Sequence, residues 1–490
     1  MKPEQRDTNS QPMPRTPERW LLLIFVLSLP LINPWVRGDG VGYYAFARAP
    51  LIQHNLDFTA DYQHANPGFR ELRLDAMGQP LQDFRTSTGH LDNHFSVGPA
   101  ILWAPVLIVV HRGVLTAKAL GSSVTADGFS APYRVAMALT TVLLGFCGLL
   151  LAFRIAGKYV EERWALLAAL AVWGGTSLPV YMYFNPSWSH AQSAFAVAVF
   201  FGYWLKTRED RSLFQWLILG LVAGLMLNVY YVNAVLLVLL LPEAVRAYAS
   251  AAPRAASAGQ AFWSLLAKHA VFVGSVAVCL LPTFASHYLI YGSPFESGYV
   301  PLARWSWTSP HLVQVLFSSD HGLLAWTPLI AFSFIGLLLF WRRNPSEGGP
   351  VLLAVLAFYY VIASYPDWDG ISSFGNRFFV SLTIFFVLGL AILLQRAAAY
   401  FSSRASALAL TSTMLAFLVI WNVGLIFQWG THLIAARGPV AWSQVVCNQF
   451  AVVPGRFSSQ IGEYLFHRRQ LMKRLEQQDA MQRKQLSAPE

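Results

Sequence analysis

An aspartate between two glycines, in the stretch VRGDGVGYYAFARAP, directly follows the first apolar run of the chain. Asp39 is followed closely by Tyr43, Tyr44 and Arg48, so a carboxylate, two phenols and a guanidinium stand together. A carboxylate in this position can act as a general base toward an attacking hydroxyl. It can also serve only as a turn or cap residue, which is the commoner role of an aspartate in a loop.

Further residues suited to acid–base chemistry or anion binding stand beside other apolar runs. In chain order they are Asp92 and His94 in LDNHFSVGP, His190 in FNPSWSHAQ, Asp320 and His321 in SSDHGLLAWTP, and Asp367, Asp369 and Arg377 in YPDWDGISSFGNRFF. One by one, such residues usually face water, and the neighbouring tryptophans usually form an interfacial belt. Gathered beside a membrane, polar groups normally line a cavity, so we expect one site built from several loops.

Eleven apolar segments must position these loops. With 55% hydrophobic and 12% charged residues, the 490-residue chain is far more apolar than a soluble domain, in which about 25% of residues are charged. We predict an all-α, polytopic integral membrane protein with about 11 transmembrane helices. The segments are 20–37, 132–155, 164–184, 188–206, 213–230, 231–247, 267–291, 322–342, 350–365, 374–396 and 405–428.

Charge distribution sets the predicted orientation. If the N-terminus is cytoplasmic and segment 99–117 does not cross, the short cytoplasmic loops hold 13 basic residues and the short outer loops hold 2. A crossing at 99–117 would reverse this bias, so the positive-inside rule favours the first model. The uninterrupted apolar part of 99–117 has only 12 residues, which favours an in-plane helix. Residues 38–131 then form one long loop on the outer, periplasmic face of a bacterial inner membrane.

The predicted chain has three parts: a disordered cytoplasmic N-terminus (1–19), a transmembrane domain (20–428) and a polar basic tail (429–490). The tail would lie outside, where its eight basic residues fit the positive-inside rule poorly. The net charge of +10 comes mostly from residues between apolar segments, so it favours membrane orientation over nucleic-acid binding. Three cysteines give neither a disulfide nor a zinc framework.

The order of these segments resembles the GT-C superfamily of polytopic glycosyltransferases. The similarity is greatest to bacterial relatives of protein mannosyltransferases and of the aminoarabinose transferase for lipid A. It rests on the acid just after the first span, on DNHFSVGPAILWAPVLIVVH at the end of a long outer loop, and on SWSHA, SSDHGLLAWTPL and SFGNRFF. Two departures are Gly40, where the family commonly has a second acid, and Phe-Ser after His94, where it has Pro-Pro.

The resemblance implies transfer of a sugar from a polyprenyl-phosphate donor to a hydroxyl of a lipid, glycan or protein acceptor. Asp39 matches the general base, His94 a second catalytic group, and Arg377 a ligand of the donor phosphate, whose charge a guanidinium can bind through two hydrogen bonds. The remaining predicted substrate-binding residues are Arg48, Tyr43, Tyr44, Asp92, His190, Asp320, His321, Asp367 and Asp369. Snorkelling to lipid headgroups is the alternative role of Arg377.

Two other functions stay open. An O-antigen ligase or polymerase would depend on outer-loop arginine and histidine rather than on a carboxylate base. A lipid-linked-sugar flippase or other transporter would show inverted repeats and charges near the bilayer midplane. No cofactor is predicted, because no metal-binding spacing such as H-E-x-x-H is present. A divalent metal held by Asp39 with His94 and His190 stays open as well.

Overall fold

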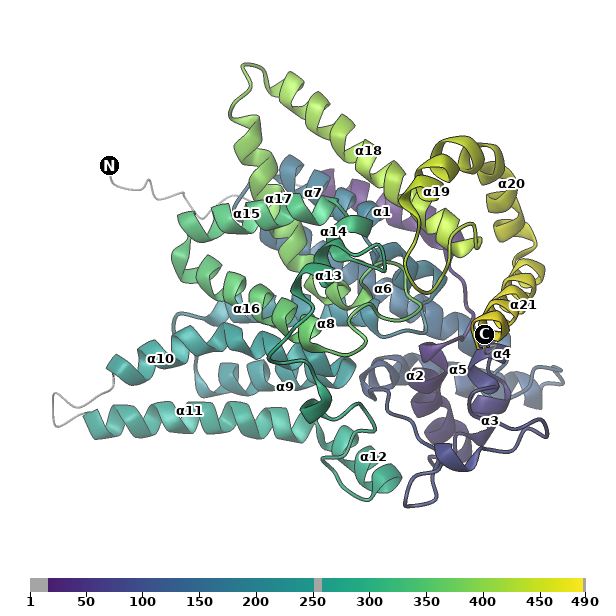
Figure 1. Cartoon of the computed structure of the whole chain (residues 1–490). Helices are drawn as coiled ribbons and strands as arrows, with labels where there is room; N and C mark the ends of the chain where they lie inside the picture. The colour runs from purple at the N-terminus through teal and green to yellow at the C-terminus, as the bar shows by residue number, and fades with distance from the viewer. Residues whose placement is uncertain (1–15, 251–257, 488–490) are drawn as a thin grey trace, which may run out of the picture.

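The computed structural model describes residues 16–250 and 258–487, and the regular elements among these residues are helices, with two isolated β-bridges between residues 74 and 91. Figure 1 shows them packed as one bundle with a smaller group of helices on one side. The chain is an all-α polytopic membrane protein, as predicted. The bundle helices are α1 (Thr16–Ser28), α6 (Ala131–Ala156), α7 (Glu162–Gly175), α8 (His190–Thr207), α9 (Leu213–Val229), η5 (Tyr231–Leu240), α10 (Leu241–Ser250), α11 (Ala258–Cys279), α12 (Leu281–Tyr291), α15 (Leu329–Arg343), α16 (Pro345–Ser364), η7 (Arg377–Leu382), α17 (Thr383–Ala398) and α18 (Arg404–Gly430).

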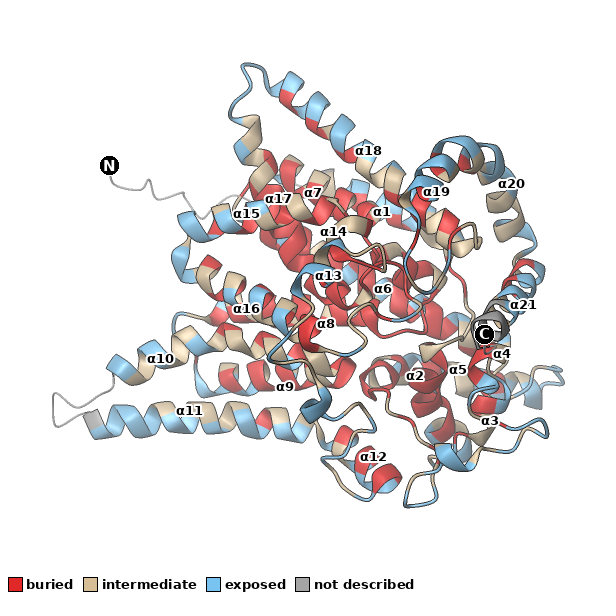
Figure 2. Cartoon of the chain, viewed as in Figure 1, coloured by how far each residue is buried: buried red, intermediate tan, exposed pale blue. Residues whose placement is uncertain are grey.

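Seven helices among the described residues are long and apolar enough to cross a membrane, judged by length and composition. The most apolar window of η7–α17 is 89% buried and lies at the centre of the bundle, whereas that of α11 is 6% buried (Figure 2). An apolar helix that leaves its side chains exposed fits a lipid surrounding, because lipid tails take the place of a protein core there. Residues 1–15 of the predicted disordered N-terminus lie outside the described residues, and 16–19 form the first turn of α1.

Several predicted spans are interrupted near one end of the bundle. The predicted split at LNVYYVN is confirmed, because α9 ends at Val229 and Tyr230 is extended before the 3-10 helix η5 begins. Segment 164–184 divides into α7 and the π-turn η4 (Val180–Phe184). Such breaks shorten individual helices, and the count of eleven spans stays a prediction.

The predicted cytoplasmic loops lie together at one end. Arg154 Nε donates to Glu18 Oε1 (2.8 Å), and Arg208 Nη1 lies 3.1 Å from Glu347 Oε1. All four residues come from segments predicted to share the cytoplasmic side. These loops therefore share one end of the bundle, as the charge model groups them, and the face of the membrane to which that end belongs stays a prediction.

At the opposite end, which we call the polar end, the predicted outer loops 38–131, 185–189, 292–321 and 366–373 contact one another. The long loop 38–131 is mostly folded rather than irregular. Its helices are α2 (Asp39–Arg48), η2 (Ala49–Gln53), α3 (Thr59–Gln63), α4 (Pro67–Arg70), η3 (Gln82–Phe84) and α5 (Gly98–Ala119), and the other short helices here are η1 (Leu29–Leu31), η6 (Leu302–Arg304), α13 (Leu312–Phe317) and α14 (Leu323–Trp326).

Helix α5 runs antiparallel to the N-terminal half of α6. Trp103 Nε1 donates to Thr141 Oγ1 (2.8 Å), and His111 Nδ1 lies 2.6 Å from the Tyr133 hydroxyl. The helix has 22 residues, lies along α6 and is one of the seven helices that could cross by length and composition, so the length argument and the predicted in-plane orientation are both wrong. In this register α5 begins level with the middle of α6, so α5 does not reach the end of α6 that carries Arg154.

The C-terminal segment folds back onto the bundle instead of forming a separate tail. Figure 1 shows its helices in yellow, beside the first residues of the long loop. Trp35 Nε1 donates to Glu476 Oε1 (2.7 Å), and Arg37 Nη2 donates to Asp479 Oδ2 (3.0 Å). The interpretation of 429–490 as a separate polar tail is corrected, because Leu471, Met472 and Leu475 are buried and pack against Trp35. The elements are α19 (Trp442–Cys447), η8 (Asn448–Val452), α20 (Val453–Phe466) and α21 (Arg468–Ser487).

Candidate active site

Helix α2 begins at a point of close packing between two loops. Gly38, its N-cap, has a φ of +53°, a conformation that favours glycine, and its N–H donates to Asn66 Oδ1 (2.9 Å). At Gly40 the requirement is space, because a Cβ would lie 1.9 Å from Ser187 Oγ. The chain therefore turns sharply at Gly38, while Gly40 allows loop 185–189 to pack on the helix.

The first residue of α2, Asp39, forms an ion pair with Arg377. Arg377 Nη1 donates to Asp39 Oδ2 at 2.6 Å, and their side chains are 12% and 32% exposed for Arg377 and Asp39. The guanidinium also lies 4.6 Å above the ring of Trp188, which adds a cation–π contact. Arg377 Nε has no hydrogen-bond partner among the described residues. The pair therefore leaves the buried Nε–H of the guanidinium fork without an acceptor in the described chain.

Two phenols lie close to this pair. Tyr43 follows Asp39 by one helical turn and so lies on the same face of α2, buried, with its ring 4.9 Å from that of Phe95. Burial, and then the charge of Asp39, raise the pKa of Tyr43. Burial and the charge of Asp367 raise the pKa of Tyr365 to about 12. Both phenols are protonated at neutral pH and can donate hydrogen bonds.

His190 is buried at the start of α8 between two more tyrosines. Its ring centroid lies 4.6 Å from that of Tyr181 and 5.3 Å from that of Tyr230. Its Nδ1 has no hydrogen-bond partner in the part of the chain that is described. His190 is predicted from the sequence, whereas both tyrosines are missed, although the helix break at LNVYYVN marks the position of Tyr230.

His94 pairs with Asp92 rather than with Asp39. His94 Nδ1 lies 3.3 Å from Asp92 Oδ2, and the Tyr291 hydroxyl donates to Asp92 Oδ1 (2.8 Å). Burial alone would raise the pKa of Asp92, but the hydrogen bond and charge of His94 hold it below its ordinary value. His94 therefore does not pair with Asp39, with which a shared metal was considered, because a spacing of two residues lets His94 bond to Asp92 within its own loop.

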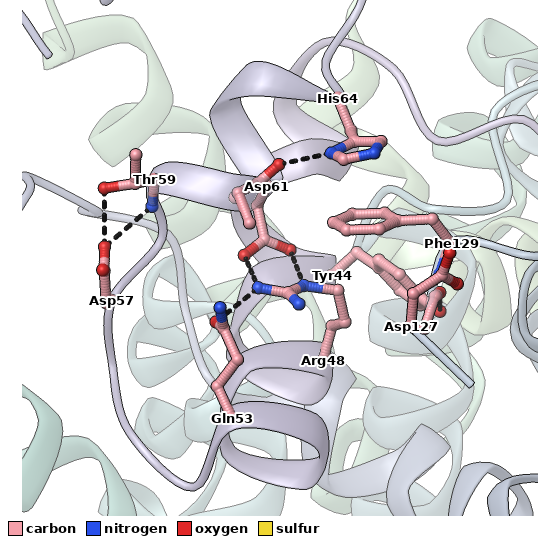
Figure 3. A network of polar contacts seen from close by, with 12 residues as sticks. Tyr44, Arg48, Gln53, Asp57, Thr59, Asp61, His64, Asp127 and Phe129 are labelled. Carbon is pink, nitrogen blue, oxygen red and sulfur yellow. Dashed lines mark hydrogen bonds and ion pairs between the residues drawn. The ribbon is translucent and has the colours of Figure 1, made fainter. Parts of the chain in front are cut away.

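Arg48 and Tyr44 belong to a separate cluster (Figure 3). Arg48 donates to both carboxylate oxygens of Asp61, at 2.6 and 2.7 Å, and both side chains are buried. The Tyr44 hydroxyl donates to the carbonyl of Gly128 (2.7 Å). Tyr44 and Arg48 are four residues apart and share one face of α2, next to the face of Asp39 and Tyr43. Because Arg48 is already paired, its contacts favour a role in holding the long loop over a role in substrate binding.

Asp320, His321 and Asp369 come together from two loops. One ligand-type atom of each lies within 4.8 Å of those of the other two. His321 has no exposed side-chain surface, and burial lowers its pKa to about 4. Burial and the neighbouring Asp369 raise the pKa of Asp320 to about 6. Asp367 is half-buried and stays outside this cluster.

The cluster adjoins the ion pair through the loop after α16. Gly370 has a φ of +77°, and a Cβ there would lie 3.3 Å from Arg377 Nε. Asp39, Tyr43 and His190 thus lie around Arg377. Asp320, His321 and Asp369 form the cluster beside it, and Asp367 lies in the same loop but outside the cluster. Arg48 and Tyr44 lie apart from both, and Asp92 and His94 form a further pair.

A cavity of about 820 Å³ lies beside the ion pair. Gly38 and Trp188 are among the residues that line it, and Trp188 also contacts Arg377, whereas Asp39 and Arg377 themselves do not line it. Its volume falls in the range of about 300–1,000 Å³ that is usual for small-molecule sites. The sequence did not predict it, because the C-terminal helices that close it were interpreted as a tail. Its apolar wall includes Ile24, Leu31, Trp173, Phe427, Ile461 and Leu475.

Comparison with known proteins gives a likeness to solved structures but none to a described family. No protein-family model and no curated protein matches the chain. Among solved structures, the chain is similar to ArnT from Cupriavidus metallidurans in the apo state, with 12% sequence identity and a TM-score of 0.45 over 84% of this chain and 72% of that one. This is a likeness of fold alone. At this identity and TM-score it assigns no residue role and no substrate to this chain.

Proposed function

We propose that this protein is a membrane glycosyltransferase that moves a sugar from a polyprenyl-phosphate donor to an acceptor hydroxyl at the polar end. The Asp39–Arg377 pair carries the proposal, because a base and a phosphate-binding cation lie 2.6 Å apart at the end of a membrane bundle. Glycosyl transfer needs both, one for the acceptor proton and one for the leaving phosphate. The apolar cavity beside the pair fits the third requirement, a place for part of a lipid chain.

Arg377 binds the donor phosphate in this mechanism. Its Nη1 donates to Asp39, while its Nε has no partner among the described residues. An incoming phosphate competes with Asp39 for the fork and can accept two of its N–H groups. The exchange keeps the buried guanidinium paired with an anion and releases the carboxylate.

Asp39 then acts as the general base. As the acceptor oxygen attacks the anomeric carbon, Asp39 takes the hydroxyl proton and the bond from that carbon to the phosphate oxygen breaks. The electron pair of the broken bond stays on polyprenyl phosphate, whose charge Arg377 stabilises. Tyr43 and Tyr365, both protonated, are placed to donate hydrogen bonds to sugar hydroxyls.

Transport is less well supported than transfer. The ion pairs of the described residues fall into two groups, one at each end of the bundle, whereas a transporter places its charges at mid-depth. A ligase or polymerase would share Arg377 but would not depend on Asp39.

The decisive experiment incubates purified protein with a panel of polyprenyl-phosphate sugars and measures donor consumption and release of polyprenyl phosphate. Consumption by the wild type, and its loss in Asp39→Asn, is the expected result. Full activity of Asp39→Asn together with loss in Arg377→Ala would favour the ligase mechanism. Movement of an intact lipid-linked sugar across vesicles, without consumption, would favour transport.

A further inference from the structure

We propose that Asp320, His321 and Asp369 bind one divalent transition-metal ion beside Arg377. The three residues offer two carboxylates and one imidazole from two loops that are far apart in sequence. None of them belongs to the spacing patterns that mark metal sites in sequences, so only the folded chain brings them together.

The distances match a site that needs little adjustment. Ligands bind such ions at about 2.0–2.2 Å, so neighbouring ligands of one ion are about 3 Å apart and opposite ligands about 4.4 Å apart. His321 Nδ1 lies 3.5 Å from Asp320 Oδ1 and 3.1 Å from the backbone carbonyl oxygen of Asp369. The three ligand-type atoms lie within 4.8 Å of one another. The imidazole, the Asp320 carboxylate and the Asp369 carbonyl are thus close to the separation of neighbouring ligands, and the Asp369 carboxylate must move closer to complete the shell.

Burial makes the cluster costly unless a cation binds there. The His321 side chain has no exposed surface, and it is held by a backbone with a φ of +57°, which non-glycine residues rarely adopt. Within the described residues, Asp320 Oδ1 and His321 Nε2 have no hydrogen-bond partner. The two carboxylates are half-buried and lie close together, so they repel each other, and a divalent ion replaces that repulsion with attraction. Binding of the ion at Nδ1 would replace that atom's hydrogen bond to the Asp369 carbonyl and leave the ring proton on Nε2.

The donor set selects the kind of ion. Carboxylate and carbonyl oxygens alone would suit Mg²⁺ or Ca²⁺, while an imidazole among them favours Mn²⁺ or Zn²⁺. If the proposed function holds, the ion adds a second positive charge next to Arg377, where the donor phosphate would bind. The metal site itself stands without that function.

The test measures Mn²⁺ binding to the purified full-length chain after treatment with a chelator. Calorimetry and electron paramagnetic resonance should report one tightly bound Mn²⁺ per chain, displaced by Zn²⁺ but not by equal Mg²⁺. Asp369→Asn and Asp320→Asn should each weaken binding by at least about tenfold, since even losing a residue that only supports a ligand costs that much. Asp367→Asn is the matched control and should bind as the wild type does.

Absence of a tight ion in the wild type would overturn the proposal, and that measurement does not depend on whether the variants fold. If Asp367→Asn weakens Mn²⁺ binding as much as Asp369→Asn does, the proposal is also overturned, because the negative charge of the loop alone would then explain the binding. Donor consumption is measured separately. One bound Mn²⁺ in a protein that consumes no donor supports the metal site and counts against the glycosyltransferase.

Discussion

Asp39 and Arg377 hold each other in the geometry that glycosyl transfer would need. Asp39→Asn keeps the size of the side chain but cannot accept a proton. General-base catalysis contributes about 10²–10⁴ in rate, so donor turnover should fall by that factor. Donor affinity should be unchanged or higher, because asparagine competes less strongly with phosphate for Arg377. Turnover and donor Kd are measured on the same preparation: turnover should fall, and Kd should stay the same or fall.

Asp39→Asn should also lower the stability of the folded protein. Removing one partner of a fully buried ion pair costs about 3–5 kcal/mol, and Asp39, which is 32% exposed, should cost less than that. The Tm of Asp39→Asn should therefore fall, and added donor should restore part of it by pairing with Arg377. A near-normal turnover in a well-folded Asp39→Asn preparation would leave Asp39 with a structural role only.

Arg377→Lys tests the guanidinium fork. Lysine keeps the charge but cannot donate two parallel hydrogen bonds, and a lost hydrogen bond to a charged group is worth about 1.5–3 kcal/mol. Donor Kd should rise by roughly tenfold or more, while the protein still folds. If Arg377→Lys binds donor as tightly as the wild type, the phosphate must bind elsewhere.

Most residues of the candidate site could be chosen from the sequence, but the pairing between them could not be predicted from it. Asp39 and Arg377 were each identified by an unusual setting, between glycines and at the outer end of an apolar helix. They are 338 residues apart, and no local pattern encodes such a contact. The partnership of His94 was misjudged for the same reason, since bonding within a loop competes with bonding across loops.

At the level of elements, the position of Asp39 depends on how closely α2 packs on loop 185–189. Gly40→Ala would place a Cβ 1.9 Å from Ser187 Oγ, and Ser187 is fully buried. Overpacking of this kind costs about 1–3 kcal/mol, so Tm should fall and turnover with it.

Gly113→Ala in α5 is the matched control, because its Cβ would meet nothing within 4 Å. There alanine should raise helix stability by up to about 1 kcal/mol. Equal thermal shifts in the two variants would show that the contact with Ser187 does not constrain α2.

The ends of a helix could be predicted where the residue composition changes along the chain. They could not be predicted where contacts between distant segments determine the fold. The break at Tyr230 follows from a polar aromatic run within an apolar segment of more than spanning length. The fold-back of α20 and α21 has no such signal, because a basic, polar sequence also describes a solvated tail. Only contacts such as that of Trp35 with Glu476 make these helices part of the molecule.

For the whole molecule, these contacts decide the side of the C-terminus. Arg37, two residues before Asp39, pairs with Asp479, and α21 contacts α4 in the long loop. The tail must then share the side of the polar end, although its basic residues argue for the cytoplasm. Arg468 reduces that conflict, because it donates to the carbonyls of Pro30 and Ile32 instead of standing as a free charge.

Cysteine labelling tests the two-sided arrangement in a chain whose three native cysteines are replaced. Single cysteines at Ser130, Ser212 and Ser459 sample the long loop, a predicted cytoplasmic loop and α20. A membrane-impermeant reagent should label 130 and 459 on intact cells with the outer membrane opened, and 212 only after the inner membrane is broken. Labelling of 212 together with 130 would contradict the charge-based topology. Labelling of 459 together with 212 would contradict the fold-back of the C-terminal helices, since the ion pair of Arg37 with Asp479 cannot form across a bilayer.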